Sequence, residues 1–133
     1  MIALLALTAC GGGDGTDDPR SEYLDKGNAI CRDAKADIRR AVRQGSGAEE
    51  PTSLNQVARQ TVIPRLEGQL TALRQLPVPP ADASILRELL GSLQSALEQS
   101  MRQPFTFGPA EDSPFATPDR LARVYGLTAC VSG

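Results

Sequence analysis

The stretch of this 133-residue chain that decides the fold runs from residue 81 to residue 102 and reads ADASILRELLGSLQSALEQSMR. Its apolar residues recur at steps of three and four, which places them on one face of an α-helix. It is the most apolar of the helical segments, so we predict a helix that starts near residues 81–82 and forms the centre of the core. The predicted inward face contains Ile85, Leu86, Leu89, Leu90, Leu93, Leu97 and Met101.

Residues 21–45 show the same helical periodicity. We predict Ser21 as the N-cap, because a serine hydroxyl can accept a hydrogen bond from a free backbone N–H of the first turn. The run Gly45-Ser46-Gly47 is predicted to end this helix. Its inward face contains Leu24, Gly27, Cys31, Ala34, Ile38 and Ala41.

A second helical pattern begins near Thr52 or Ser53 and is stopped by the proline-rich run at residues 76–80. Pro64 falls inside it, and a proline removes one helical hydrogen bond and clashes with the carbonyl four residues earlier. We therefore predict that Pro64 kinks this helix or divides it in two. Its inward face contains Leu54, Ala58, Val62, Leu66, Leu70 and Leu73.

Residues 103–116 contain three prolines and are predicted to form an irregular loop. A short last helix follows, with Thr117 as its N-cap, Pro118 in its first position and Gly126 as its C-cap. No strand signal of useful length appears, so the predicted fold class is all-α, a small four-helix bundle. The inward residues of the last helix are Leu121, Val124 and Tyr125.

The first ten residues combine an apolar run with a cysteine. The string Leu7-Thr8-Ala9-Cys10 resembles the lipobox of bacterial lipoproteins, in which the cysteine is diacylated and becomes the new N-terminus. The resemblance implies a signal peptide over residues 1–9 and lipidation of Cys10. No Lys or Arg precedes Arg20, and signal peptides usually run to about 15–30 residues, so we expect a start further upstream. The alternative is a chance Leu-Thr-Ala-Cys string.

The residues that follow Cys10 are rich in glycine and aspartate, which is typical of a flexible polar tether. We therefore expect a lipidated cysteine and tether over residues 10–20 and one helical domain over residues 21–133. The apolar opening is far shorter than the about 20 residues that cross a bilayer. The expected membrane contact is the N-terminal lipid, which implies a lipid-anchored protein at the extracytoplasmic face of the cell membrane.

The chain contains three cysteines, Cys10, Cys31 and Cys130. If Cys10 carries lipid, the other two remain as a pair in an oxidising compartment, where a disulfide can persist. We therefore predict a bond that joins the first helix to the C-terminal tail. The alternative is two separate buried thiols. A redox or metal role is not expected, because the chain has no C-x-x-C spacing and no histidine.

A second resemblance is looser and spread along the chain. Its residues are Tyr23-Leu24…Asn28-Ala29-Ile30-Cys31, Leu73…Leu76-Pro77…Pro80 and Tyr125-Gly126-Leu127…Cys130. Together they resemble small exported or lipid-anchored helical proteins of high-GC Gram-positive bacteria, mostly without assigned function. The resemblance implies the helical fold and the cysteine pair, and it carries over no catalytic residue. Asn28 departs from the apolar pattern, and we expect it to hydrogen-bond the C-terminal tail.

All three phenylalanines, Phe105, Phe107 and Phe115, fall in the loop before the last helix. Because loops often carry function, these residues are candidate contacts for a partner or a ligand. The interpretation we favour is that they cap one end of the core, where a buried Phe contributes about 1.5–3 kcal/mol.

Gly27, Gly68 and Gly91 lie inside predicted helices. Either they let helices approach closely or, together with a kink at Pro64, they leave a groove for an apolar ligand. Glycine costs a helix about 1 kcal/mol relative to alanine, so close approach is the simpler interpretation.

Composition argues against several function classes. The net charge is −2 with both signs interspersed, so we expect no nucleic-acid partner. Asp14, Asp17 and Asp18 lack the spacing of a helix–loop–helix calcium site, and we expect no metal or other cofactor. Without histidine there is no Ser-His-Asp constellation, and Asp33 and Asp37 are predicted to be solvated charges on a polar face. We therefore assign no catalytic residue.

These patterns predict a non-enzymatic, membrane-tethered helical module that works through contacts with an envelope protein. The alternative is a binding protein for a small apolar ligand or lipid in the bundle interior. A dry, well-packed core would argue against that alternative. An extracytoplasmic hydrolase would need a buried, convergent polar cluster, which the sequence does not indicate.

Overall fold

The computed structural model describes residues 18–45, 54–102 and 113–132, and every regular element in these ranges is helical. The predicted all-α fold is confirmed, because four helices pack together: α1, the continuous helix α2–η1–α3, α4 and α5. The elements are α1 (Pro19–Gly45), α2 (Leu54–Val57), the π-helical turn η1 (Ala58–Val62), α3 (Ile63–Gln75), η2 (Pro80–Asp82), α4 (Ala83–Arg102), α5 (Ala116–Tyr125) and η4 (Thr128–Cys130).

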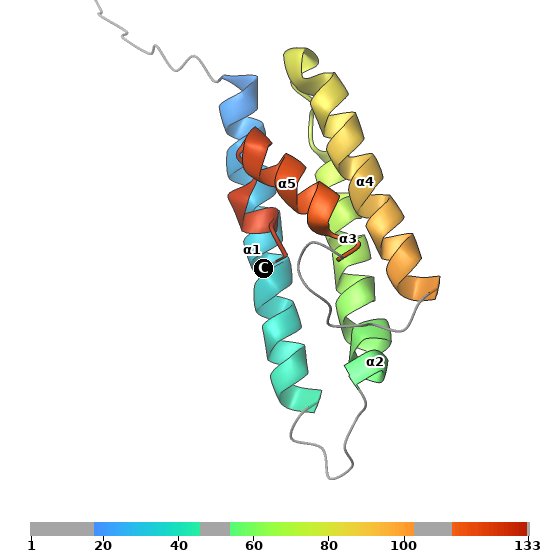
Figure 1. Cartoon of the computed structure of the whole chain (residues 1–133). Coiled ribbons are helices and arrows are strands. Elements are labelled where there is room, and N and C mark those ends of the chain that lie inside the picture. Colours follow the sequence, from blue (N-terminus) through green and yellow to red (C-terminus); the bar gives the residue numbers. More distant parts are fainter. Residues whose placement is uncertain (1–17, 46–53, 103–112, 133) are drawn as a thin grey trace, which may run out of the picture.

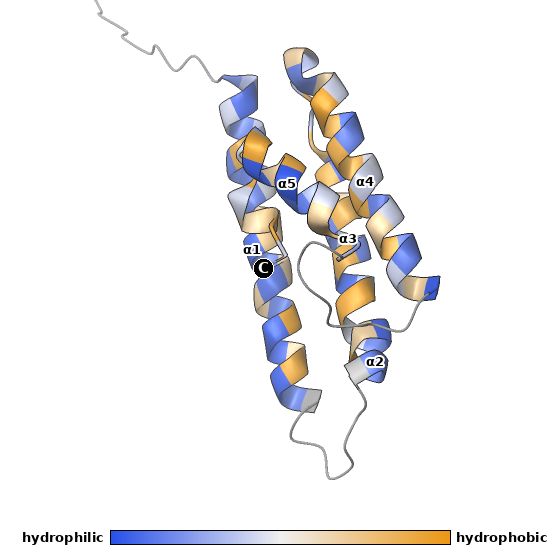
Figure 2. Cartoon of the chain, viewed as in Figure 1, coloured by the Kyte–Doolittle hydropathy of each residue, from blue (hydrophilic) through white to orange (hydrophobic). Residues whose placement is uncertain are grey.

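The three long helices α1, α3 and α4 lie side by side, with α3 between the other two and antiparallel to both (Figure 1). The short helix α5 packs against α4 and leads into η4, which returns to α1. Apolar and hydrophilic residues alternate along the helices as an amphipathic helix requires (Figure 2). The C-terminal segment therefore covers one face of the layer that the long helices form.

Helix α4 supplies the largest share of the core, as its sequence predicts. Leu86 and Leu89 are almost fully buried. The predicted inward face is wrong at its end, because Met101 is 43% exposed and Ser100 is buried instead. The Ser100 hydroxyl donates a hydrogen bond to the Ala96 carbonyl at 2.8 Å, which offsets the cost of burying it.

Pro64 is accommodated by a π-helical turn. The N–H of Ile63 donates to the carbonyl of Ala58, five residues back. In a regular α-helix a proline ring crowds the carbonyl four residues earlier, and a π-turn widens the helix at such a point. The helix is therefore not divided at Pro64, which lies in the first turn of α3.

Helix α1 begins three residues before the predicted start. Its first residue is Pro19, and Asp18 rather than Ser21 caps its first turn. Asp18 Oδ1 accepts a hydrogen bond from the backbone N–H of Arg20 at 3.3 Å. The Ser21 hydroxyl instead donates to Asp18 Oδ2 at 3.1 Å.

Helix α5 also differs from its prediction at three points. It begins at Ala116, so Thr117 lies inside the helix and is not its N-cap, and Pro118 is its third residue rather than its first. Val124 is 67% exposed, and Ala122 faces the core in its place. The predicted C-cap is confirmed, because Gly126 has a φ of +106°, a conformation that glycine adopts readily.

Close helix approach explains one of the three helical glycines. A Cβ atom at Gly27 would lie 2.7 Å from Cδ2 of the fully buried Leu127, so any larger residue would force that side chain to shift. At Gly68 and Gly91 an added Cβ would meet no atom within 4 Å, so close approach does not account for them.

Candidate functional site

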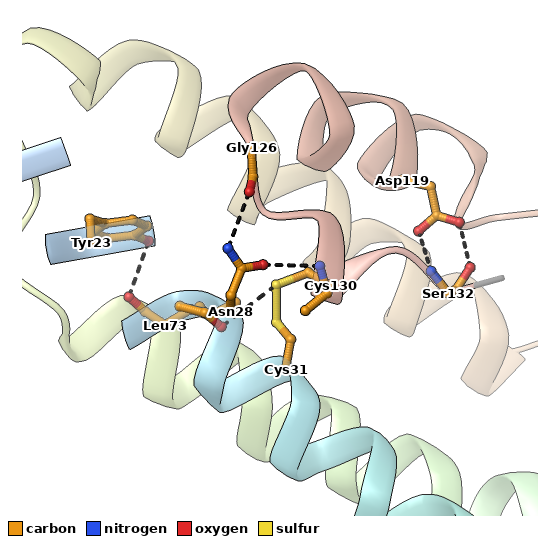
Figure 3. Close-up of a disulfide and its surroundings, with 10 residues drawn as sticks. Tyr23, Asn28, Cys31, Leu73, Asp119, Gly126, Cys130 and Ser132 are labelled. Atoms are coloured by element: carbon orange, nitrogen blue, oxygen red, sulfur yellow. Dashed lines mark hydrogen bonds between the residues drawn. A yellow bond between two sulfur atoms is a disulfide. The ribbon is translucent and has the colours of Figure 1, made fainter. Parts of the chain in front are cut away.

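The C-terminal tail is joined to α1 by a disulfide bond between Cys31 and Cys130 (Figure 3). Their Cα atoms are 4.9 Å apart, and the two residues are separated by 99 positions in the chain. The predicted pairing is confirmed, and the alternative of two separate thiols is wrong. Cys31 is fully buried on the inner face of α1, so the bond forms part of the core.

Two polar residues hold the same tail in place (Figure 3). Asn28 Nδ2 donates to the Gly126 carbonyl at 3.2 Å, and Asn28 Oδ1 accepts from the Ala129 N–H at 2.9 Å, which confirms the predicted bonding of Asn28. Asp119 accepts hydrogen bonds from the backbone N–H and the hydroxyl of Ser132, at 2.9 Å and 2.5 Å. The tail is therefore positioned against both α1 and α5.

A polar cluster joins the start of α1 to η2 and the end of α5. The Tyr125 hydroxyl donates to Asp82 Oδ2 at 2.9 Å, and Arg20 Nη1 lies 3.5 Å from Asp82 Oδ1. The Arg20 guanidinium lies 4.8 Å from the centroid of the Tyr125 ring, over its face. The Tyr23 ring meets the Tyr125 ring edge-on, with centroids 6.0 Å apart.

Burial raises the pKa of Tyr125 far above its usual value. The hydrogen bond to Asp82 and the charge of that carboxylate raise it further, while Arg20 lowers it. Burial also raises the pKa of Tyr23, whose hydroxyl donates to the Leu73 carbonyl at 3.4 Å. Each of these groups has a partner within the cluster or the adjacent helix, so we interpret the cluster as structural. Sequence reasoning did not find it, although the chain has only two tyrosines.

A cavity of about 430 Å³ lies between α1, α3, α4 and the C-terminal segment. None of Gly27, Gly68 and Gly91 borders it, so it is not the groove that these glycines suggested. Most of its lining is apolar, and it comes from the inward faces of the helices. The described lining residues are Lys35, Ile38, Arg39, Val62, Leu66, Gln69, Leu73, Leu89, Leu93, Ser113, Phe115, Pro118, Asp119, Ala122, Cys130 and Ser132.

The polar lining residues of this cavity differ in whether they have hydrogen-bond or ion-pair partners. Lys35 and Arg39 lie one turn apart on α1, and neither forms an ion pair or hydrogen bond with a residue in the described ranges. Gln69 is only 5% exposed, and its side chain also has no hydrogen-bond partner among the described residues. The Asp119 carboxylate, in contrast, is occupied by Ser132. The cavity thus combines apolar walls with three polar groups that have no hydrogen-bond or ion-pair partner among the described residues.

The candidate contacts predicted from the sequence are only in part described. Phe115 is 7% exposed and packs with the core, as the capping interpretation predicts, and it also borders the cavity. Phe105 and Phe107 lie outside the described residues, as does Cys10. The sequence therefore identified one lining residue by its type, while Lys35, Arg39 and Gln69 carried no recognisable signal.

No protein-family model, curated protein or solved structure matches this chain. The resemblance to exported helical proteins therefore stays a prediction. Within the parts of the chain that the structure describes, no helix combines the length and the apolar character needed to cross a bilayer. In the same ranges, no three His, Cys, Asp or Glu side chains come together in a way that could hold a metal ion.

Proposed function

We propose that this chain is a non-enzymatic binding protein for a small apolar ligand, held at the extracytoplasmic face of a membrane by lipid on Cys10. The cavity is the observation that carries the proposal. Its volume of about 430 Å³ lies in the range of about 300–1,000 Å³ that is usual for small-molecule sites. Its apolar walls lose dispersion contacts when nothing fills it, so an apolar ligand is the natural occupant.

The cellular location rests on two features. The string Leu7-Thr8-Ala9-Cys10 and the glycine-rich residues after it have the character of a lipid attachment site and a tether. The disulfide between Cys31 and Cys130 supports export, because such bonds persist mainly in oxidising compartments. Intact mass of the native protein tests this part. We expect a diacylated N-terminal Cys10, and a protein that keeps residues 1–9 and carries no lipid would contradict it.

The other predicted function, contact with an envelope protein, has less support. The large apolar side chains that are exposed among the described residues lie on four different segments. Single exposed apolar residues are normal on a protein surface. These residues are Val42, Val78, Met101 and Val124.

A fluorescence titration tests ligand binding. N-phenyl-1-naphthylamine, a neutral probe that brightens in apolar surroundings, is added to the oxidised full chain and to two variants. Leu66→Trp places a large ring in the lining of the cavity, whereas Ile85→Trp does so at a similarly half-buried position away from it. We expect saturable one-site binding to the parent and to Ile85→Trp, and at least tenfold weaker binding to Leu66→Trp. Absence of saturable binding to the parent, or equal binding to both variants, would refute the proposal.

A further inference from the structure

Lys35 and Arg39 differ from the paired cations of α1 and, unlike Arg32, which also pairs with no described residue, they border the cavity. Lys26 pairs with Glu22, and Arg40 pairs with Asp37. Lys35 and Arg39 border the cavity and pair with no residue that the structure describes. Like charges one turn apart destabilise a helix, and an anion bound beside them relieves that repulsion. The charge pattern of this edge of the cavity thus matches an anionic group.

The negative charge that borders the cavity is smaller than the positive charge of Lys35 and Arg39. Asp119 is the only carboxylate among the described lining residues. It already accepts two hydrogen bonds from Ser132 on the C-terminal side of the cavity. Among the described lining residues two cations therefore outnumber one carboxylate, which leaves an excess of one positive charge.

Gln69 adds a second polar group, and it is buried. Its side chain is nine-tenths or more buried, borders the cavity, and has no hydrogen-bond partner in the described ranges. Among the described residues no side-chain N or O atom is both fully enclosed and without a partner, so the amide stays within reach of a small molecule. It also borders a shallow depression between α1 and α3. A buried amide normally has a partner, and an oxygen-bearing ligand supplies one.

The size of the cavity limits the apolar part of the ligand. A volume of about 430 Å³ holds roughly a dozen water molecules at about 30 Å³ each. A methylene group is close to a water molecule in volume. One hydrocarbon chain of medium length therefore matches this space in volume better than the two long chains of a membrane phospholipid.

From these observations we infer that the ligand is a single-chain amphiphile with a carboxylate head, bound with its chain in the cavity and its head at Lys35 and Arg39. The Gln69 amide donates a hydrogen bond to an oxygen of that head. The inference rests on the proposed function and adds to it the chemical class of the ligand.

A displacement series tests the head group. The same neutral probe is first bound to the oxidised full chain and is then displaced by dodecanoate, dodecanol or dodecylamine, which share one chain and differ in charge. We expect dodecanoate to displace it at about tenfold lower concentration than either of the others, the ratio expected for one charge-assisted hydrogen bond. After incubation with vesicles of an anionic two-chain phospholipid and re-isolation, the protein should carry no phospholipid by native mass spectrometry, a readout that uptake of the apolar probe by vesicles does not affect.

Three substitutions test which residues cause the preference for dodecanoate. Arg39→Glu should abolish the preference for dodecanoate, while Arg32→Glu, at an exposed arginine of the same helix away from the cavity, should keep it. Gln69→Leu should weaken the binding of dodecanoate and leave the binding of the neutral probe unchanged. Thermal unfolding monitored by circular dichroism establishes that each variant is folded.

The outcomes separate this inference from the function on which it rests. Equal displacement by the three dodecyl compounds would overturn the inference that the ligand has a carboxylate head. Equal effects of Arg39→Glu and Arg32→Glu would do the same, and neither result would contradict the binding of an apolar ligand. Phospholipid that stays bound to the re-isolated protein after the vesicle incubation would overturn the inference of a single chain. Failure of the probe to bind at all would refute both proposals.

Discussion

The side-chain amide of Asn28 donates a hydrogen bond of 3.2 Å to the backbone carbonyl of Gly126, 98 positions further along the chain. Gly126 is the residue that ends α5, and the oxygen of the same amide accepts the N–H of Ala129. One side chain of α1 therefore fixes both the exit of the chain from α5 and its return toward the disulfide. These contacts set the position of the tail that forms one side of the cavity.

Substitution of this residue should loosen the tail. Asn28→Ala leaves a half-buried carbonyl and a half-buried N–H without their partners, so we expect a loss of about 1–3 kcal/mol in the free energy of unfolding. Urea unfolding of the oxidised protein measures it. Gln99→Ala, at an exposed position of α4, is the control and should change stability by less than about 0.5 kcal/mol. Similar free energies of unfolding for the two variants would show that the hydrogen bonds of Asn28 do not stabilise the tail.

Reduction of the disulfide should destabilise the protein strongly. The bond between Cys31 and Cys130 closes a loop of about 100 residues, so its loss removes a restraint on the unfolded chain worth up to about 4.7 kcal/mol. We expect the urea midpoint to fall when dithiothreitol is added, and the Cys31→Ala, Cys130→Ala double variant to match the reduced parent. A midpoint that does not respond to the reductant would contradict a pairing of these two cysteines.

Two glycine substitutions should act in opposite directions. Gly27→Ala should destabilise the protein by about 1–3 kcal/mol, because the new Cβ would lie 2.7 Å from the fully buried Leu127. Gly91→Ala meets no atom within 4 Å and should stabilise α4 by up to about 1 kcal/mol. Thermal unfolding of the two variants beside the parent checks the sign of each change. A stabilising Gly27→Ala would mean that α1 and the tail do not approach as closely as described.

Stability should fall at alkaline pH because of the two tyrosines. Burial raises the pKa of Tyr125 and of Tyr23, while tyrosine in an unfolded chain titrates near pH 10. Above about pH 10 the unfolded chain therefore loses these protons and the folded chain keeps them, so the free energy of unfolding decreases as pH rises. Urea unfolding between pH 8 and pH 11 measures the slope. Tyr125→Phe should flatten it, and an unchanged slope in that variant would exclude Tyr125 as its source.

Much of the fold follows from local patterns in the sequence. The core face of α4, the helical end at Gly126 and the pairing of Cys31 with Cys130 were all predicted. Each of these predictions depends on few residues. They rest on helical spacing, on a glycine at the end of a periodic segment and on a count of cysteines. The errors lie mainly at helix ends. At Met101 and Val124 the neighbouring helices decide which side of the last turn is covered, and periodicity alone does not contain that information.

The candidate site could be predicted much less well. Lys35, Arg39 and Gln69 have ordinary residue types and spacings for a helix surface. They become distinctive only when the structure places them around one cavity, where none of them has a partner among the described residues. The cavity itself arises where four helical segments meet, which depends on their relative placement. Phe115 was found by its residue type, although as one member of a set of three.

The central claim is that an apolar ligand enters the cavity between the helices, and methyl NMR tests it most directly. In a full chain with labelled leucine methyl groups, N-phenyl-1-naphthylamine should give saturable shift changes and intermolecular nuclear Overhauser effects at Leu66, Leu89 and Leu93, which line the cavity. The methyls of Leu86, which is buried outside it, should show no such effects. Absence of saturable changes at the three lining leucines, or contacts confined to other residues, would contradict the account.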